Sequence, residues 1–345
     1  MAERDGARHL ARLMARGCDF LGSDCAIMGG AMTWVSERTL VSAISNAGGF
    51  GVLACGAMEP GRLGEEIRAT RARTARPFGV NLIVMHPRLD ELVETVIAES
   101  VSHVVLAGGL PPARALSRLR DAGAKVLAFA PTVAIARKLV RAGVHALIVE
   151  GTEAGGHIGP VATQVLAQEI LPALAEVVPV FVAGGIGHGA MIAAYLEMGA
   201  AGVQLGTRFV CARESIAHPD FKRAFIRAAA RDAVASVQLD PRFPVIPVRA
   251  LKNRASETFM RFQAETIDRV ARGELTEEQG RLAIEHYWAG ALRRAVIDGD
   301  VENGSLMAGQ SVGMVRREQD AATIIAELLD EAARHLERTE PACPA

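Results

Sequence analysis

The chain has 345 residues, enough for one large α/β domain with a smaller addition. Its 38 Lys and Arg residues and 39 Asp and Glu residues leave a formal net charge of -1, so charge gives no reason to expect a nucleic-acid or membrane partner. The five cysteines are scattered without C-x-x-C spacing, which argues against a disulfide framework or a metal site, and no run approaches the ~20 apolar residues that span a bilayer. We therefore expect a cytoplasmic protein that acts on a small molecule.

The first predicted element is a basic helix on the surface, because Arg4, Arg8, Arg12 and Arg16 surround short apolar runs that do not form the core of a secretory signal. After it, short apolar runs with β-branched residues alternate with amphipathic segments, the pattern of a parallel sheet with crossover helices. The predicted strands cover residues 26–28, 51–54, 79–84, 103–106, 125–129, 146–149, 178–182 and 202–205. The predicted helices lie near residues 36–46, 61–73, 89–99, 112–122, 132–142, 163–175, 188–198 and 216–230. Eight β/α units predict a (β/α)8 TIM barrel more simply than an open doubly wound sheet.

The β/α rhythm stops near residue 232, where a Pro-rich stretch leads into polar helical sequence. We therefore predict a barrel over residues 1–231, a small helical domain inserted over the barrel mouth at 232–303, and a return loop with a closing helix at 304–345. The return loop is rich in glycine and should reach the barrel mouth. The candidate substrate-pocket residues are Met32, Met307, Ala308, Gly309 and Gln310.

The strongest candidate for chemistry is His157, which lies in the glycine-rich stretch 150–159 directly after the sixth predicted strand. The loops at the carboxyl ends of barrel strands carry the active site in this architecture. Gly155 and Gly156 imply special backbone angles around the histidine, and an imidazole with a near-neutral pKa moves protons or stabilises an anion. We therefore predict that His157 is catalytic.

Two carboxylates in the same stretch have alternative interpretations. Glu150 and Glu153 would orient His157 or contact a ribityl chain, but a carboxylate at a strand end equally caps a helix.

Two later loops predict a phosphate site. Gly184 and Gly185 follow the seventh predicted strand, and Gly206 and Thr207 follow the eighth, where barrels commonly bind phosphate through backbone N–H groups. Small residues after the first strand, with Asn81 on the third, leave room for a flat heterocycle. A mononucleotide cofactor such as FMN would fit, whereas the chain lacks an early G-x-G-x-x-G that would indicate a Rossmann fold.

These motifs together resemble the FMN-dependent nitronate monooxygenases, also called 2-nitropropane dioxygenases, and the related type II flavin enoyl-acyl-carrier-protein reductases. The resemblance spans nearly the whole chain. It rests on residues 27–35, 45–49, 77–81, 150–159, 183–186 and 206–209.

The resemblance implies FMN as the cofactor, and the residues that would contact it are Gly29, Gly30, Ala31, Asn81, Glu150, Gly155, Gly156, Gly184, Gly185, Gly206 and Thr207. His157 would be the catalytic residue beside the flavin. The leading expectation is a nitronate monooxygenase that oxidises alkyl nitronates with O2 to carbonyl compounds and nitrite. The alternatives are an NAD(P)H-dependent enoyl reductase or quinone reductase of the same family, favoured by residues 248–253 and 298–310, and a flavin-binding barrel without turnover. A homodimer is a further expectation.

Overall fold

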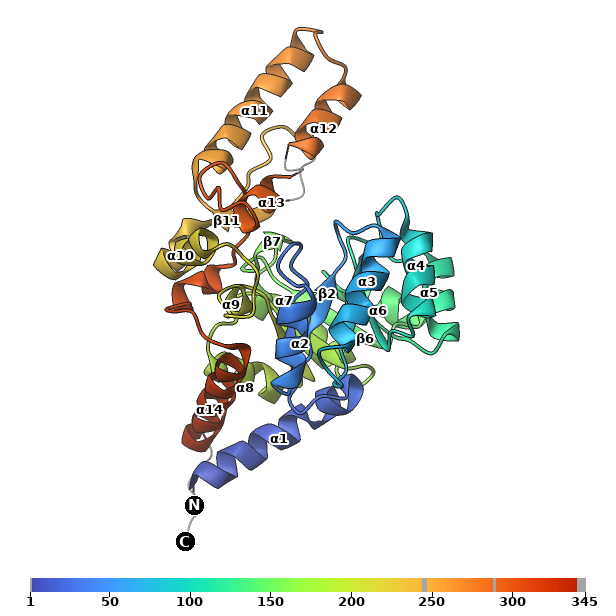
Figure 1. Ribbon diagram of the computed structural model, residues 1–345, viewed down its shortest axis with the longest axis vertical. Coiled ribbons are helices and arrows are strands. Elements are labelled where there is room, and N and C mark those ends of the chain that lie inside the picture. The colour runs from blue at the N-terminus through green and yellow to red at the C-terminus, as the bar shows by residue number, and fades with distance from the viewer. Residues whose placement is uncertain (1, 244–246, 288–289, 340–345) are drawn as a thin grey trace.

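The computed structural model describes residues 2–243, 247–287 and 290–339, and its main body is a closed barrel of eight parallel strands (Figure 1). Neighbouring strands run in the order β1-β9-β8-β6-β5-β4-β3-β2. The barrel closes because Met28 bridges to Phe50, two residues before β2, with Gly29 N donating to Phe50 O at 2.9 Å. The predicted TIM barrel is confirmed. Met1 and residues 340–345, which belong to the predicted first and third parts, lie outside the described residues.

The barrel elements agree with the predicted ranges to within a few residues. The strands are β1 (Ile27–Gly29), β2 (Val52–Ala54), β3 (Gly79–Ile83), β4 (His103–Ala107), β5 (Lys125–Phe129), β6 (Ala146–Glu150), β8 (Val180–Ala183) and β9 (Gly202–Leu205). The helices are α2 (Arg38–Asn46), α3 (Pro60–Arg71), α4 (Leu89–Ala98), α5 (Ala113–Asp121), α6 (Val133–Ala142), α7 (Thr163–Leu174), α8 (Gly189–Glu197), α9 (Thr207–Val210) and α10 (Pro219–Arg227). Aromatic residues make up only 4% of the chain, because its strands are short, aliphatic and buried on both faces.

Two long helices lie side by side at the end of the molecule where both chain termini are found (Figure 1). They are α1 (Ala2–Leu21), the predicted basic helix, and α14 (Ala321–Thr339), the predicted closing helix. Leu10 and Met14 of α1 and Leu328 of α14 are buried in the main core, so these helices are integral to the barrel domain. None of the helices in the described part of the chain combines the length and apolar character needed to cross a bilayer.

A second, smaller sheet stands at the barrel mouth. It has the order β10-β11-β7, from β10 (Ala233–Ala235), β11 (Val248–Leu251) and β7 (Gly156–His157), and all three pair antiparallel. The chain then forms α11 (Arg254–Ala271), α12 (Glu277–His286) and α13 (Ala291–Val296). The hairpin of α11 and α12 has its own small core around Phe243, Phe259 and Ile284, and it projects away from the barrel while α13 and β11 form its base (Figure 1). The predicted helical addition is therefore anchored at the mouth by a sheet that sequence patterns did not indicate.

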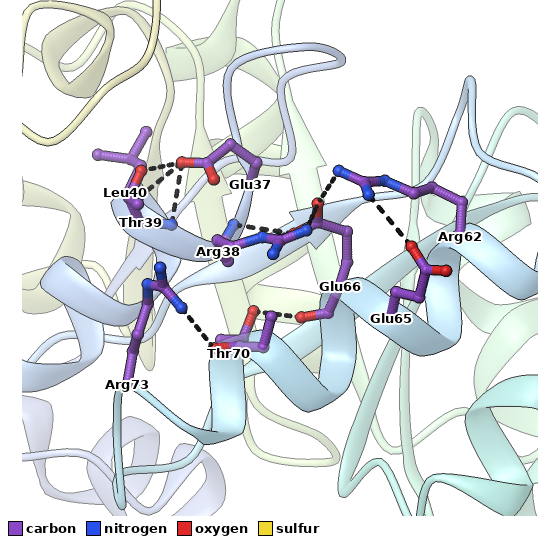
Figure 2. A network of polar contacts seen from close by, with 10 residues as sticks. Glu37, Arg38, Thr39, Leu40, Arg62, Glu65, Glu66, Thr70 and Arg73 are labelled. Carbon is purple, nitrogen blue, oxygen red and sulfur yellow. Dashed lines mark hydrogen bonds and ion pairs between the residues drawn. The ribbon is translucent and has the colours of Figure 1, made fainter.

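A network of charged side chains joins α2 to α3 (Figure 2). The Arg38 guanidinium donates to both oxygens of Glu66, at 2.9 Å from Nε and 2.6 Å from Nη2, and Arg62 donates to the same carboxylate at 2.7 Å. Glu66 is 2% exposed, and Arg38 and Arg62 together lower its pKa although burial by itself would raise it. Glu37 accepts from Thr39 N at 2.9 Å, which caps α2. The network therefore holds α2 and α3, the first two crossover helices, against each other.

Two further short elements lie between β9 and the closing helix. They are η1 (Ala230–Asp232) before β10, and η2 (Gln310–Met314) before α14.

Candidate active site

Three polar side chains face the barrel axis at the carboxyl ends of the strands. A Cβ on Gly151 would lie 2.1 Å from the Thr163 hydroxyl of α7, outside the barrel, so strand alternation turns the preceding Glu150 inward. The register pairs Glu150 with Ala183 and Ala183 with Gln204, which places Gln204 on the same inner face. The same reasoning from Gly51, which faces α2, turns Ala54 and its register partner Asn81 inward.

Gln204 was missed at the sequence level, although it lies two residues before Gly206 on the eighth predicted strand. Strand alternation from the Gly206 loop was the signal that could have indicated it. Gln204 is 7% exposed, and neither its amide nor the Glu150 carboxyl has a hydrogen-bond partner within residues 2–243, 247–287 and 290–339. Asn81 donates from Nδ2 to Val105 O at 3.2 Å. Two neutral amides and one carboxyl therefore line the floor of the mouth.

Glu150 carries no ion pair among the described residues, and burial raises the pKa of its carboxyl to about 8. Part of the side chain remains accessible from the mouth, but the surrounding protein withholds the water that would solvate a carboxylate. Burial therefore favours the protonated form of this carboxyl near neutral pH. A protonated carboxyl donates a hydrogen bond or a proton, which an ion-paired carboxylate does not do.

His157 lies on β7 and pairs across the small sheet with Val248. Its side chain is exposed, yet the protein around the ring lowers its pKa, and no described residue hydrogen bonds to either ring nitrogen. The imidazole is therefore neutral at pH 7, with one nitrogen available as donor and the other as acceptor.

The loop that carries His157 is held by the buried Arg249 of β11. Its Nε donates to Thr152 O at 2.8 Å and its Nη1 to Ala233 O at 2.6 Å. Arg249 is 8% exposed, and burial lowers the pKa of its guanidinium. One side chain thus ties the loop after β6 to both other strands of the small sheet.

Glu153 has a structural role. Its Oε2 accepts from the backbone N of Thr163 at 2.8 Å and from the Thr163 hydroxyl at 2.9 Å, so it caps the first turn of α7. Of the alternatives open for this residue, the helix cap is the one present in the structure. Glu150 makes no such contact and stays available to a ligand.

Unused backbone donors gather after β8 and β9. Gly184 and Gly185 have φ of 95° and 70°, successive left-handed angles that favour glycine. In the described part of the chain, the N–H groups of Gly184, Gly185, Gly206 and Thr207 have no hydrogen-bond partner. Because Ala183 and Gln204 are register partners, the two loops emerge beside one another. Such converging N–H groups form an anion-binding concavity.

The loop after β1 borders the same region. A Cβ on Gly30 would lie 3.4 Å from the Gly206 Cα, and one on Gly206 would lie 3.4 Å from the Met32 sulfur. Ser36 shapes this loop by donating to Gly30 O at 2.8 Å and accepting from Met32 N at 2.9 Å. Gly29, by contrast, faces Ile44 on the outer side of the strand. Gly30, Ala31 and Met32 are the members of this predicted group that border the mouth.

Trp34, in the same loop, has a φ of 69°, which is costly for a bulky residue, roughly 1–3 kcal/mol. Arg293 of α13 lies over its ring at 5.9 Å from the centroid. The loop after β1 thereby contacts the small domain.

The predicted return loop reaches the mouth. Gly309 N donates to the Thr207 hydroxyl at 2.9 Å, and Gln310 N donates to Glu153 O at 2.9 Å. A Cβ on Gly155 would lie 2.5 Å from Gly309 N, so the two loops touch through bare backbone. Met307 bridges to Ala250 of β11, with its sulfur 3.6 Å from a Cβ built on Gly156. Residues far apart in sequence therefore enclose one site.

A closed (β/α)8 barrel with glycine-lined loops and a proton-handling group at its mouth defines the class of this protein, a barrel oxidoreductase. The family model described as nitronate monooxygenase matches residues 16–331, and the chain belongs to that family.

Two curated relatives and one solved structure extend this result. A (3aS,4S,5R,7aS)-5-hydroxy-7a-methyl-1-oxo-octahydro-1H-indene-4-carboxyl-CoA dehydrogenase of Mycobacterium tuberculosis is 32% identical, covering 92% of this chain and 96% of the relative. A nitronate monooxygenase of Paraburkholderia phytofirmans is 32% identical over 67% of this chain and 74% of the relative. The structure of FabK from Thermotoga maritima superposes with a TM-score of 0.85 at 36% identity, covering 94% of this chain and 97% of FabK.

Proposed function

We propose that this protein is an FMN-dependent oxidoreductase that acts on the acyl part of a thioester. The observation that carries the proposal is Glu150, a carboxyl with no described ion-pair partner that burial keeps protonated on the floor of the mouth. Beside it, Asn81 and Gln204 are neutral amides. A site with a proton donor and no fixed charge suits a neutral conjugated carbonyl compound. The carboxyl-CoA dehydrogenase and FabK among the similar proteins support the thioester class.

The residues present fit FMN. The unpartnered N–H groups after β8 and β9 would hold its phosphate, and the space beside Gly30, which a Cβ would fill, would take the edge of the ring system. Asn81 and Gln204 would hydrogen bond to ring atoms, because their amides face the axis. When bound, the flavin supplies two-electron transfer to or from the substrate carbon. NADH or NADPH would serve as reductant if the reaction runs toward reduction.

The chain's own residues then handle protons and exclude water. Protonated Glu150 donates a hydrogen bond to an acceptor on the ligand above β6. In oxidation neutral His157 takes a proton from the substrate carbon and becomes imidazolium, and in reduction that imidazolium returns the proton to the carbon. Met307 and residues 308–310 cover the mouth beside the loops after β6 and β9. In this proposal residues 232–303 form the substrate-covering domain.

Three anaerobic measurements test the proposal. Purified protein reconstituted with FMN should show a flavin spectrum, NADH or NADPH should bleach it, and crotonyl-CoA should restore it. His157→Ala should keep the flavin and lose about 10²- to 10⁴-fold in the reoxidation rate, the usual contribution of a general acid or base. Flavin that neither pyridine nucleotide nor thioester alters would overturn the thioester assignment and leave a flavin-binding barrel without turnover.

Nitronate oxidation is the second candidate, favoured by the family-model match and by the relative from Paraburkholderia phytofirmans. In that case neutral His157 would accept a proton from a nitroalkane or donate a hydrogen bond to its nitronate. Oxygen uptake with propyl nitronate, in the absence of any pyridine nucleotide, would decide for it. The same His157→Ala variant serves both assays.

A further inference from the structure

Two adjoining cavities form one groove on the flank of the barrel made by α8, α10 and α14 (Figure 1). They have volumes of about 370 and 520 Å³ and share Met314 and Arg316 in their walls. We call them together the η2 groove, because η2 and the residues after it run along its length.

Basic side chains predominate in the η2 groove. Its larger cavity is lined by Arg227 and Arg316 and by no carboxylate. Both arginines are exposed, and neither has an ion-pair partner within the described residues. Unlike the many arginines of this protein that are matched to a nearby Asp or Glu, these two keep their donors for another molecule.

The smaller cavity adds a buried cation. Arg208 is 7% exposed and donates to Gln319 at 2.9 Å and to Glu327 at 3.0 Å. Its Nη1 is enclosed and has no hydrogen-bond partner among the described residues. Arg317 also pairs with Glu327, and Glu331, the second carboxylate of this cavity, lies 3.5 Å from His188. Arginines still outnumber carboxylates in the lining, because Arg208, Arg316 and Arg317 line it with Glu327 and Glu331.

One end of the groove lies beside the loop that carries His157. Gln310 lines the larger cavity, and its N–H is the group that donates to Glu153 O on the loop of His157. The five residues of η2 span roughly 10 Å at the ~2 Å rise of a 3-10 helix. The apolar wall of the larger cavity consists of Ala228, Ala229 and Ala230, and Ala230 packs directly against η2, since a Cβ on Gly313 would lie 2.9 Å from Ala230 N.

We propose that the η2 groove binds the phosphates and the adenine of coenzyme A while the acyl end of the thioester lies at the barrel mouth. The CoA proposal rests on the proposed function. NADH and NADPH also contain a phosphorylated adenine nucleotide, so the same side chains could recognise them. Arg227 and Arg316 would contact phosphate oxygens, and the alanine wall would take the flat base. The pantetheine arm would pass Gln310 to reach the mouth.

The test measures binding of free CoA to FMN-loaded protein by calorimetry, so it does not depend on turnover. The double variant R227Q/R316Q should bind CoA about 10- to 100-fold more weakly, because each lost guanidinium removes a charge-assisted hydrogen bond to phosphate. Pantetheine, which lacks the nucleotide, should bind wild type and variant equally. Arg223→Gln is the matched control, because Arg223 lies on the same helix, pairs with Asp220 and does not line the groove.

Unchanged CoA affinity in the double variant would overturn the groove assignment even if the enzyme reduces crotonyl-CoA, since the proposed function would then stand alone. Weakened binding of NADH or NADPH with unchanged binding of CoA would assign the groove to the pyridine nucleotide and overturn the CoA proposal. Weakened CoA binding in an enzyme without thioester turnover would support the groove while the proposed function fails.

Discussion

Gly309 and Thr207, 102 residues apart in sequence, are joined by a buried hydrogen bond of 2.9 Å from the glycine N–H to the threonine hydroxyl. The hydroxyl accepts this bond and keeps its own hydrogen to donate, so one side chain anchors the return loop and remains available to an anion in the cradle after β9. In the proposed phosphate site, closure of the mouth and binding of the anion would thereby be coupled through Thr207.

Thr207→Val should therefore impair both properties. The valine has nearly the same shape but leaves the Gly309 N–H buried without a partner, at a cost of about 1–3 kcal/mol in the free energy of unfolding. Urea unfolding would measure that loss, and titration of the apoprotein with FMN would show weaker binding. Thr207→Ser keeps the hydroxyl and should resemble wild type in both assays, and a valine variant indistinguishable from wild type would refute the coupling.

Gly155→Ala should displace the return loop. The added methyl would lie 2.5 Å from Gly309 N and 2.7 Å from the Ala308 carbonyl carbon, backbone atoms that cannot turn aside. We expect lower thermal stability and lower turnover, with more rapid hydrogen exchange at Ala308 and Gly309. Gly159→Ala is the control in the same stretch, because nothing lies within 4 Å of its Cβ position. Equal effects of the two substitutions would contradict the close-packing argument.

Glu66→Gln should destabilise the barrel domain by roughly 2–4 kcal/mol, because it removes the shared partner of Arg38 and Arg62 from a buried position (Figure 2). The pKa of Glu66 is lowered in the folded state, so its contribution is present above the ordinary carboxyl pKa and is lost as the pH falls through the folded value. Wild type and variant should thus converge in stability as the pH is lowered below about 4. Glu65→Gln, which removes an exposed partner of Arg62, should change stability by less than about 1 kcal/mol.

Glu150→Gln should flatten the dependence of stability on pH. Because the pKa of Glu150 is about 8 in the folded protein and 4.5 in its ordinary state, the folded chain holds a proton that the unfolded chain has released between these values. The free energy of unfolding of wild type therefore falls across this interval and levels off above it, whereas the glutamine variant lacks this contribution. Urea unfolding at pH 5, 7 and 9 would show the free energy of unfolding of the variant rising relative to that of wild type as the pH rises. Parallel curves would show that the carboxyl is ionised throughout.

Much of the barrel was predictable because its elements are encoded locally. Each strand is a short apolar run, and the helices before Gly123, Gly143 and Gly199 are followed by glycines with φ of 81°, 96° and 101°, the left-handed angles typical of a helix C-terminus. Hydrophobic periodicity and helix-capping signals involve only a few neighbouring residues, so they can be recognised without knowing which strands pair with one another.

The site was only partly predictable. The glycine loops and His157 can be recognised as sequence motifs. Gln204 could be identified only once the strand register showed that it lies on the inner face of β9. Glu150 and Glu153 could be assigned different roles only from the structure, in which Glu153 accepts a hydrogen bond from Thr163 N and caps α7. The β10-β11-β7 sheet was missed because β7 is two residues long and pairs with β11, where Val248 lies 91 residues (248 − 157) after its partner His157, beyond the reach of local pattern.

The sequence by itself determined a (β/α)8 barrel, the order of its strands and the loops that carry glycine and histidine, since strand and helix formation depend on local periodicity and backbone freedom. Only the tertiary structure decided which side chains lose their water and which keep unused donors. Protonation of Glu150, the free N–H groups after β8 and β9, and the unmatched arginines of the η2 groove all depend on which distant segments surround each group. Solvation and charge pairing are properties of that three-dimensional environment.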